Sequence, residues 1–308
     1  MDKEDVRQRI ASLNVWKRGD QRAPHKPLLL LYALGRCLRG EERLIPFKEA
    51  DQKLRKLLLE FGPPRKSFHP EYPFWRLQND GIWEIPNAEN LQKRKSNSDV
   101  PRSILLKNDI HGGLKEEVHR YLAGDKQFLG EMVSQILNAG FPPSIHEDIL
   151  QAVGIDMDET TARATARDPL FRIKILQAYE YQCAVCGFNV RIGDSLVALE
   201  AAHIKWYQAG GPDMESNGIA LCSLHHKLFD RGAFTITQDM KLKVSEIAHG
   251  TFGFKEWLLA FHDREIRPPQ RQSYFPGTDY VKWHVREVFK GYARENMIQK
   301  IWTLFGDD

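Results

Sequence analysis

The sequence predicts an α+β protein built from two domains, and three observations support this class. The chain has 308 residues, which is enough for two domains of ordinary size. Helical spacing of apolar residues dominates the first half, and short alternating segments appear in the second half. Residues 155–168 are rich in small and charged side chains. We interpret them as a linker between one domain at 1–154 and another at 169–308.

The first half predicts a mostly helical domain that contains one β-hairpin. Apolar residues at helical spacing predict helices near 2–15, 27–40 and 47–62, with three more helical segments up to about residue 154. Two short aromatic segments, 74–78 and 82–85, flank an Asn-Asp-Gly turn. That arrangement is typical of a hairpin.

The second half predicts smaller elements in a different order. A helix leads into a Cys-x-x-Cys knuckle, an alternating strand follows at 195–204, and a helix starts near Leu221. Residues 232–246 predict a closing hairpin. The last 55 or so residues are rich in aromatics and are expected to pack back onto this domain.

Composition excludes several classes of protein. Hydrophobic residues make up 42% and charged residues 28% of the chain, as in ordinary globular proteins. The charged N-terminus lacks the apolar segment of a secretory signal, and the longest apolar run, 28–34, is too short to span a bilayer. We therefore expect a cytoplasmic protein with no membrane partner. Residues 1–150 carry 25 Lys/Arg against 21 Asp/Glu, a small excess that an ordinary solvated surface explains best.

Three of the four cysteines have metal-ligand spacing. Cys183-x-x-Cys186 and Cys222-x-x-His225 form a Cys₃His set that suits tetrahedral, structural Zn²⁺. A redox Cys-x-x-Cys pair is the alternative, but it would need a βαβ context that the sequence lacks. Cys37 lies in an apolar helix and is expected to be a core residue.

The histidine next to the zinc ligands points elsewhere. His226 lies about 100° around the helix from His225, and Asp230 follows it at i+4 on the same face. A histidine and a carboxylate on one face can bind Mg²⁺, Mn²⁺ or another divalent ion and leave positions for phosphate oxygens. A capping or surface role is the alternative for Asp230.

Residues 170–245 resemble the HNH nucleases of the ββα-metal class. The resemblance is carried by LEAAHI, NGIALC, HHKLFDRG and the following FTI, in that order. It implies that His203 is the general base, that Asn217 holds the loop and the base, and that His226 binds the catalytic metal, with Asp230 at the place of a further ligand. The chain departs from many HNH enzymes at Ala202, where they have a metal-binding Asp or His. Glu200 lies on the same strand face and is a weak candidate to replace it.

Most of residues 1–150 resemble the sulfur-binding domain of the phosphorothioate-dependent, McrA-like HNH restriction endonucleases. The segments that carry this resemblance are APHKPLLLLYALGR, FGPPR with YPFWRL, DGIWE and HGGL. It implies that the partner is double-stranded DNA in which sulfur replaces a phosphate oxygen, held in a shallow apolar cavity. Tyr72 and Pro73 are the expected cavity residues. The expected polar or cationic contacts are His25, Lys26, Arg65 and Arg102.

Two other interpretations remain open. A modification-dependent nuclease could read a methylated base in an aromatic cage around Trp75 and Trp83, although Phe74 and Trp75 are more readily explained as core residues. A non-catalytic, zinc-stapled DNA-binding protein is the second, and the intact nuclease residues argue against it. Cutting both strands needs two HNH units or sequential nicking, so a homodimer is plausible.

Overall fold

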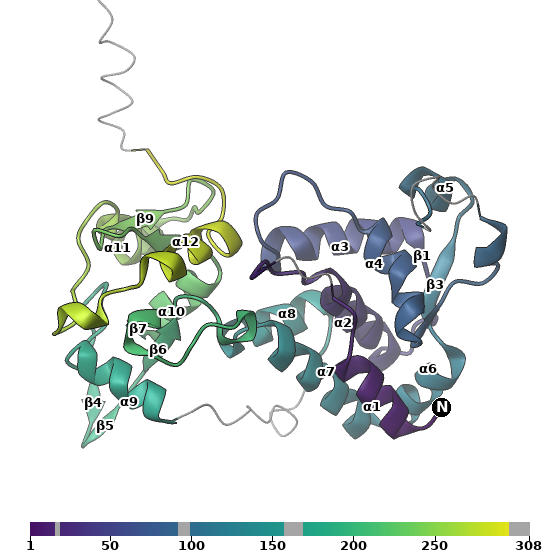
Figure 1. Ribbon diagram of the computed structural model, residues 1–308, viewed down its shortest axis with the longest axis horizontal. Coiled ribbons are helices and arrows are strands. Elements are labelled where there is room, and N and C mark those ends of the chain that lie inside the picture. Colours follow the sequence, from purple (N-terminus) through teal and green to yellow (C-terminus); the bar gives the residue numbers. More distant parts are fainter. Residues whose placement is uncertain (16–18, 92–98, 157–168, 296–308) are drawn as a thin grey trace, which may run out of the picture. The chain divides into compact units, whose positions relative to one another are not determined.

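The computed structural model describes residues 1–15, 19–91, 99–156 and 169–295. The chain divides into two compact units, Met1–Thr165 and Ala166–Asp308 (Figure 1). Most of the predicted linker, residues 157–168, lies outside the described residues. No helix in the described part of the chain is both long and apolar enough to cross a membrane.

Helix α2 (His25–Leu38) is the central helix of the first unit. Its apolar residues are buried on all sides, which is typical of a helix enclosed by others. Gly35 permits close packing, because a Cβ there would lie 2.4 Å from the carbonyl oxygen of Val153. The helices that pack against α2 are α3 (Phe47–Phe61), α4 (Glu71–Arg76), α6 (Glu116–Gly124), α7 (Lys126–Gly140) and α8 (His146–Val153). Two further helices are α1 (Lys3–Ala11) and α5 (Arg102–Lys107).

A small antiparallel sheet completes the first unit. Its order is β1-β3-β2, from β1 (Leu44–Pro46), β3 (His111–Leu114) and β2 (Trp83–Glu84). Gly113 in the central strand has no room for a side chain, since a Cβ there would lie 2.0 Å from the carbonyl oxygen of Arg43.

The predicted hairpin at 74–85 is wrong. Its first segment forms the end of α4 and a 3₁₀ turn at Leu77–Asp80, and only the second segment forms a strand, which pairs with β3. Gly81 has φ 77° and caps the 3₁₀ turn. A left-handed glycine ends a helix as readily as it turns a hairpin, so the local signal did not distinguish the two.

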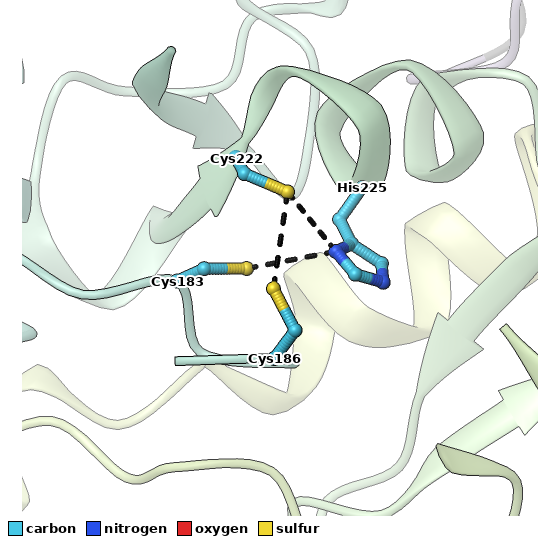
Figure 2. A group of neighbouring side chains, drawn as sticks. All are labelled: Cys183, Cys186, Cys222 and His225. Atoms are coloured by element: carbon cyan, nitrogen blue, oxygen red, sulfur yellow. Dashed lines mark hydrogen bonds between the residues drawn. The ribbon is translucent and has the colours of Figure 1, made fainter. Parts of the chain in front are cut away.

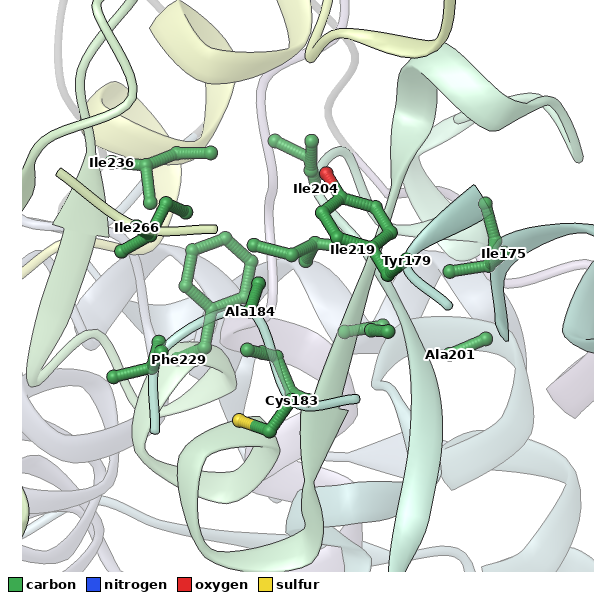
Figure 3. Close-up of a cluster of buried hydrophobic side chains, with 14 of the residues drawn as sticks. Ile175, Tyr179, Cys183, Ala184, Ala201, Ile204, Ile219, Phe229, Ile236 and Ile266 are labelled. Atoms are coloured by element: carbon green, nitrogen blue, oxygen red, sulfur yellow. The ribbon is translucent and has the colours of Figure 1, made fainter. Parts of the chain in front are cut away.

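The second unit is built around the antiparallel hairpin of β6 (Leu199–His203) and β7 (Gly218–Cys222). Helices α9 (Pro169–Ala178) and α10 (Ser223–Asp230) pack against this hairpin. Side chains from these four elements, among them Ile175, Ala201, Ile219 and Phe229, form one buried apolar cluster (Figure 3). The cluster fixes the helices on the hairpin.

The closing hairpin predicted at 232–246 is confirmed as β8 (Phe234–Ile236) and β9 (Leu242–Val244). Among the described residues, the second unit also has the strands β4 (Arg191–Ile192) and β5 (Ser195–Leu196) and the α-helices α11 (Phe252–Trp257) and α12 (Thr278–Glu287). Trp283 and His284 of α12 are buried. The ring of His284 stacks on that of Phe229 in α10, with centroids 3.8 Å apart, so this part of the aromatic tail packs back as predicted.

Candidate functional site

The β6–β7 hairpin separates two groups of polar side chains, one around His203 at its loop end and one around Cys222 at its other end. His203 pairs with Gly218 at the loop end, and Leu199 pairs with Cys222 at the opposite end. Strand residues advance about 3.3 Å each, so the five-residue strand β6 places the two groups roughly 13 Å apart.

His203 is held on two sides. Its ring stacks on Phe171 of α9, with centroids 4.0 Å apart and planes 12° apart. Its Nε2 lies 2.7 Å from Oδ1 of Asp213. The stack fixes the plane of the ring, and the hydrogen bond fixes which edge faces Asp213.

Asn217 is fully buried and closes the loop that follows His203. Its Oδ1 accepts from the Lys205 N–H at 2.8 Å, and its Nδ2 donates to the carbonyl oxygens of Lys205 and Pro212, each at 3.0 Å. A buried amide satisfied in this way stabilises a single loop conformation. This geometry is what a loop-holding role for Asn217 requires.

His226 lies between two carboxylates. Its Nδ1 is 2.6 Å from Oε2 of Glu200, and its Nε2 is 3.1 Å from Oδ2 of Asp230. Burial alone would lower the pKa of His226, but Asp230 and then Glu200 raise it to about 9. The other oxygen of Asp230 accepts from the Trp206 indole N–H at 2.8 Å, so both oxygens of this buried carboxylate are oriented.

The donor atoms of His226 and Asp230 fit a divalent ion. Oδ2 and Nε2 are 3.1 Å apart, a separation that lets both reach one ion at bonds of about 2.0–2.2 Å. Without an ion, a proton on the imidazole meets the carboxylate, and an ion would replace that proton. Glu200 on Nδ1 would then orient the ring, the usual role of a carboxylate behind a metal-bound histidine.

Cys183, Cys186, Cys222 and His225 converge at the other end of the hairpin (Figure 2). Their donor atoms all lie within 4.8 Å of one another. The Sγ atoms of Cys186 and Cys222 are 4.0 Å apart, and Nδ1 of His225 is 3.1 Å from Sγ of Cys222. Ligands about 2.0–2.3 Å from one tetrahedral ion have similar separations.

The other ring nitrogen of His225 is also held. Its Nε2 lies 2.8 Å from the carbonyl oxygen of Trp257. That bond directs Nδ1 toward the thiols, as in metal-binding histidines whose far nitrogen donates to a carbonyl. The two adjacent histidines therefore belong to different groups: His225 lies with the cysteines, and His226 lies with Glu200 and Asp230.

In the first unit, several of the predicted DNA-contacting residues gather near the start of α2. Burial, and to a smaller extent the charges of His69 and Arg65, lower the pKa of His25 to about 4. The rings of His69 and Tyr72 have centroids 5.3 Å apart, and the Arg76 guanidinium lies 4.6 Å from the centre of the Tyr72 ring. His25 is therefore a neutral imidazole next to an aromatic and cationic group.

Arginines on this unit are fixed by buried carboxylates. Arg102 forms two hydrogen bonds to Asp51, at 2.9 and 2.6 Å, and Arg55 contacts the same carboxylate. Arg76 forms a similar pair with Asp99, at 2.9 and 2.5 Å. Bidentate pairs of this kind set the direction of the guanidinium.

Two residues that were predicted to contact DNA, Pro73 and Lys26, are buried in the structure. Pro73 is buried, because residues 71–76 form a helix in place of the expected extended segment. Lys26 is also buried, and its ammonium binds Asp80 at 2.5 Å and the carbonyl oxygen of Asn14 at 2.7 Å. In this structure Lys26 joins parts of the first unit and is directed away from solvent.

The aromatic-cage alternative does not fit the structure. Trp75 is 8% exposed and Trp83 is 1% exposed, and the Trp83 ring packs edge-on against Phe74 with centroids 5.7 Å apart. These rings are core residues, as expected for Phe74 and Trp75.

Sequence reasoning missed two residues of the nuclease site and underweighted a third. Asp213 and Trp206 contact His203 and Asp230 from the loop between β6 and β7, and Glu200 does contact His226. The available signal was the loop itself, which places an aspartate and a tryptophan between the predicted base and Asn217.

Comparisons with known proteins match both units. A family model described as the ScoMcrA-like DNA sulfur-binding domain matches residues 3–158, and a model described as HNH endonuclease matches residues 183–237. A search of curated proteins gives no match.

Three solved structures are similar to the chain. The sulfur-binding domain of ScoMcrA complexed with phosphorothioated DNA is 21% identical, with a TM-score of 0.44 over 51% of this chain and 97% of that one. The sulfur-binding domain of SprMcrA complexed with phosphorothioated DNA is 24% identical, with a TM-score of 0.40 over 50% and 95%. The Type IV phosphorothioation-dependent restriction endonuclease ScoMcrA is 22% identical, with a TM-score of 0.40 over 46% of this chain and 27% of that protein.

The sulfur-binding family model covers half of the chain. The HNH model covers His203, Asn217 and His226, the residues predicted for the nuclease site. This chain belongs to the ScoMcrA-like DNA sulfur-binding family and carries an HNH endonuclease domain.

Proposed function

We propose that this protein is a restriction endonuclease that binds phosphorothioated DNA through its first unit and hydrolyses phosphodiester bonds with its second. The observation that carries the proposal is the presence in one chain of a sulfur-binding family domain and an HNH domain. The proposal is supported by the second unit, in which His203 ends β6, Asn217 precedes β7 and His226 lies on α10.

His203 would act as the general base. A neutral imidazole can take a proton from water near neutral pH, and the resulting hydroxide attacks the phosphorus while the 3′ oxygen leaves. Asn217 holds the loop beside the base. A divalent ion held by His226 and Asp230 would supply the positive charge that stabilises the leaving oxygen.

The Cys₃His cluster would bind structural Zn²⁺. It joins the knuckle before β4 to the start of α10, and so it would hold His226 in place relative to β6. We expect Cys183→Ser to lower the zinc content measured by mass spectrometry and to destabilise the unit. Cys37→Ser is the matched control, because Cys37 is a buried thiol of the first unit. Equal zinc content in both variants would rule out the site.

The sulfur would lie beside Tyr72 and His25. Sulfur is larger and less strongly hydrated than oxygen, so contact with a ring and a neutral imidazole favours it over a phosphate oxygen. The outward guanidiniums of Arg65 and Arg102 would contact neighbouring phosphates. Pro73 would back this surface from inside the unit.

The decisive experiment compares two duplexes of one sequence, with and without a single phosphorothioate link, in Mg²⁺ or Mn²⁺. We expect cleavage and tight binding only for the sulfur duplex. Equal cleavage of both duplexes would contradict sulfur recognition. Tight binding of the sulfur duplex without cleavage in any divalent ion would contradict the nuclease function.

A further inference from the structure

A carboxylate lies directly behind the candidate base of the nuclease site. Oδ1 of Asp213 is 2.7 Å from Nε2 of His203, and the two side chains are 28% and 12% exposed. We propose that Asp213 is a positioning residue that selects the tautomer of His203 and stabilises the imidazolium formed during hydrolysis. This inference rests on the proposed function of His203.

The hydrogen bond has a defined direction. A carboxylate is an acceptor, so the N–H of His203 must lie on Nε2 when the ring is neutral. Nδ1 is then the basic nitrogen, the atom that takes the proton from water. Because Phe171 already stacks on the ring, with planes 12° apart, the bond to Asp213 determines which nitrogen is basic without having to hold the ring plane as well.

The position of Asp213 is itself fixed. Asn217 donates to the carbonyl oxygen of Pro212, the residue just before Asp213, at 3.0 Å. The same amide group also binds both backbone groups of Lys205, two residues after His203. Asn217 thus joins Lys205, which lies two residues after His203, to Pro212, which precedes Asp213, and so helps to fix Asp213 beside the base.

The two histidines of the site have separate carboxylates. Glu200 and Asp230 contact His226, while Asp213 contacts His203. When Nδ1 of His203 accepts a proton from water, the ring becomes positively charged. The carboxylate of Asp213, which already contacts the ring, compensates this charge. No proton needs to reach Asp213 in this step.

The test uses the full-length protein and the sulfur duplex. We expect Asp213→Asn to lower kcat about 100-fold while KM and duplex binding stay unchanged. Glu215→Gln is the matched control, since Glu215 is a carboxylate two residues after Asp213 in the connection between β6 and β7. In a His203→Ala background, Asp213→Asn should cause no further loss, because the two residues act as a unit.

A spectroscopic measurement tests the proposal even if the variants fold poorly. In ¹⁵N-histidine-labelled wild-type protein, long-range proton–nitrogen spectra should show the neutral His203 ring protonated at Nε2, with the signal assigned by its absence in His203→Ala. A ring protonated at Nδ1 would overturn the proposal. So would an unchanged kcat in Asp213→Asn, or a further loss in the His203→Ala background. If the wild-type protein cleaved no duplex, the proposed function would fail, and the tautomer would still decide the role of Asp213.

Discussion

Several aspartates of the first unit and the carboxylates of the candidate nuclease site pair with different kinds of side chain. In the first unit, aspartates pair with side chains that are always charged: Asp51 with Arg55 and Arg102, Asp99 with Arg76, and Asp80 with Lys26. In the second, carboxylates of the site pair with imidazoles: Asp213 with His203, and Glu200 and Asp230 with His226. Arginine keeps its charge and its fork geometry at any ordinary pH, whereas histidine gains and loses a proton near neutrality.

The difference matches the two proposed roles. The side chains of Asp51 and Asp99 are 4% and 5% exposed, while their partners Arg102 and Arg76 are 43% and 42% exposed. The acids therefore lie inside and hold cations that face solvent, which suits a fixed surface for a polyanion. At the candidate nuclease site, His203 is the more buried partner of Asp213, which suits a proton transfer away from bulk solvent.

Removing the proposed base, His203, tests the role of the carboxylate–imidazole pairs and should give the largest effect of the variants considered. We expect His203→Ala to lower the cleavage rate of the sulfur duplex by about 10²- to 10⁴-fold, because the variant removes the imidazole proposed to take the proton from water. Duplex binding and zinc content should be unchanged. His249→Ala, an exposed histidine of the same unit, is the control. Cleavage retained in His203→Ala would refute the assignment of the base.

Lys26→Met tests whether the buried ion pair of Lys26 with Asp80 stabilises the first unit. The variant leaves the carboxylate of Asp80, whose side chain is 3% exposed, without its cation, and removing one partner of a buried pair costs about 3–5 kcal/mol. We expect urea unfolding to show a loss of this size, with Lys66→Met, on the exposed loop, as the control. A stability loss below about 1 kcal/mol together with weaker duplex binding would instead make Lys26 a DNA contact.

The lowered pKa of His25 predicts that the stability of the first unit depends on pH. Its pKa is about 4 in the folded unit and about 6.5 in the unfolded chain, so the unfolded state binds more protons between these values. The free energy of unfolding should therefore fall as the pH drops from about 6.5 to 4, by on the order of 2 kcal/mol. Urea unfolding at several pH values would measure this, and His25→Gln should remove that part of the slope. A His25 imidazole that titrates near 6.5 by NMR would contradict the burial argument.

The smallest expected effect is the difference in DNA binding between variants of Arg102 and Arg55, which both contact Asp51. Arg102→Gln removes a bidentate pair, and we expect it to weaken duplex binding and to reduce the salt dependence by about one phosphate contact. Arg55→Gln removes the weaker contact to Asp51 and leaves the pair with Arg102 in place, so it should change binding less. Equal effects of both variants across a salt titration would show that Arg102 has no special place on the DNA surface.

The sequence signals for the predicted nuclease residues are shorter-range than those for the predicted recognition surface. The Cys-x-x-Cys and Cys-x-x-His spacings and the i+4 relation of His226 to Asp230 depend on one knuckle and one helix. Local geometry alone brings such residues together. The hairpin at 74–85 failed for the opposite reason: the partner of β2 is β3, about thirty residues further along the chain, and no local pattern indicates that pairing.

By itself, the sequence predicted the α+β class, the grouping of His225 with the cysteines and the pairing of His226 with Asp230. Only the tertiary structure decided which charged groups meet. It buried Lys26 against Asp80, turned Pro73 inward on a helix, and placed Asp213 behind His203. Ion pairs and hydrogen bonds between distant segments depend on backbone positions that are set by the packing of the whole core, and residue spacing carries no information about those distances.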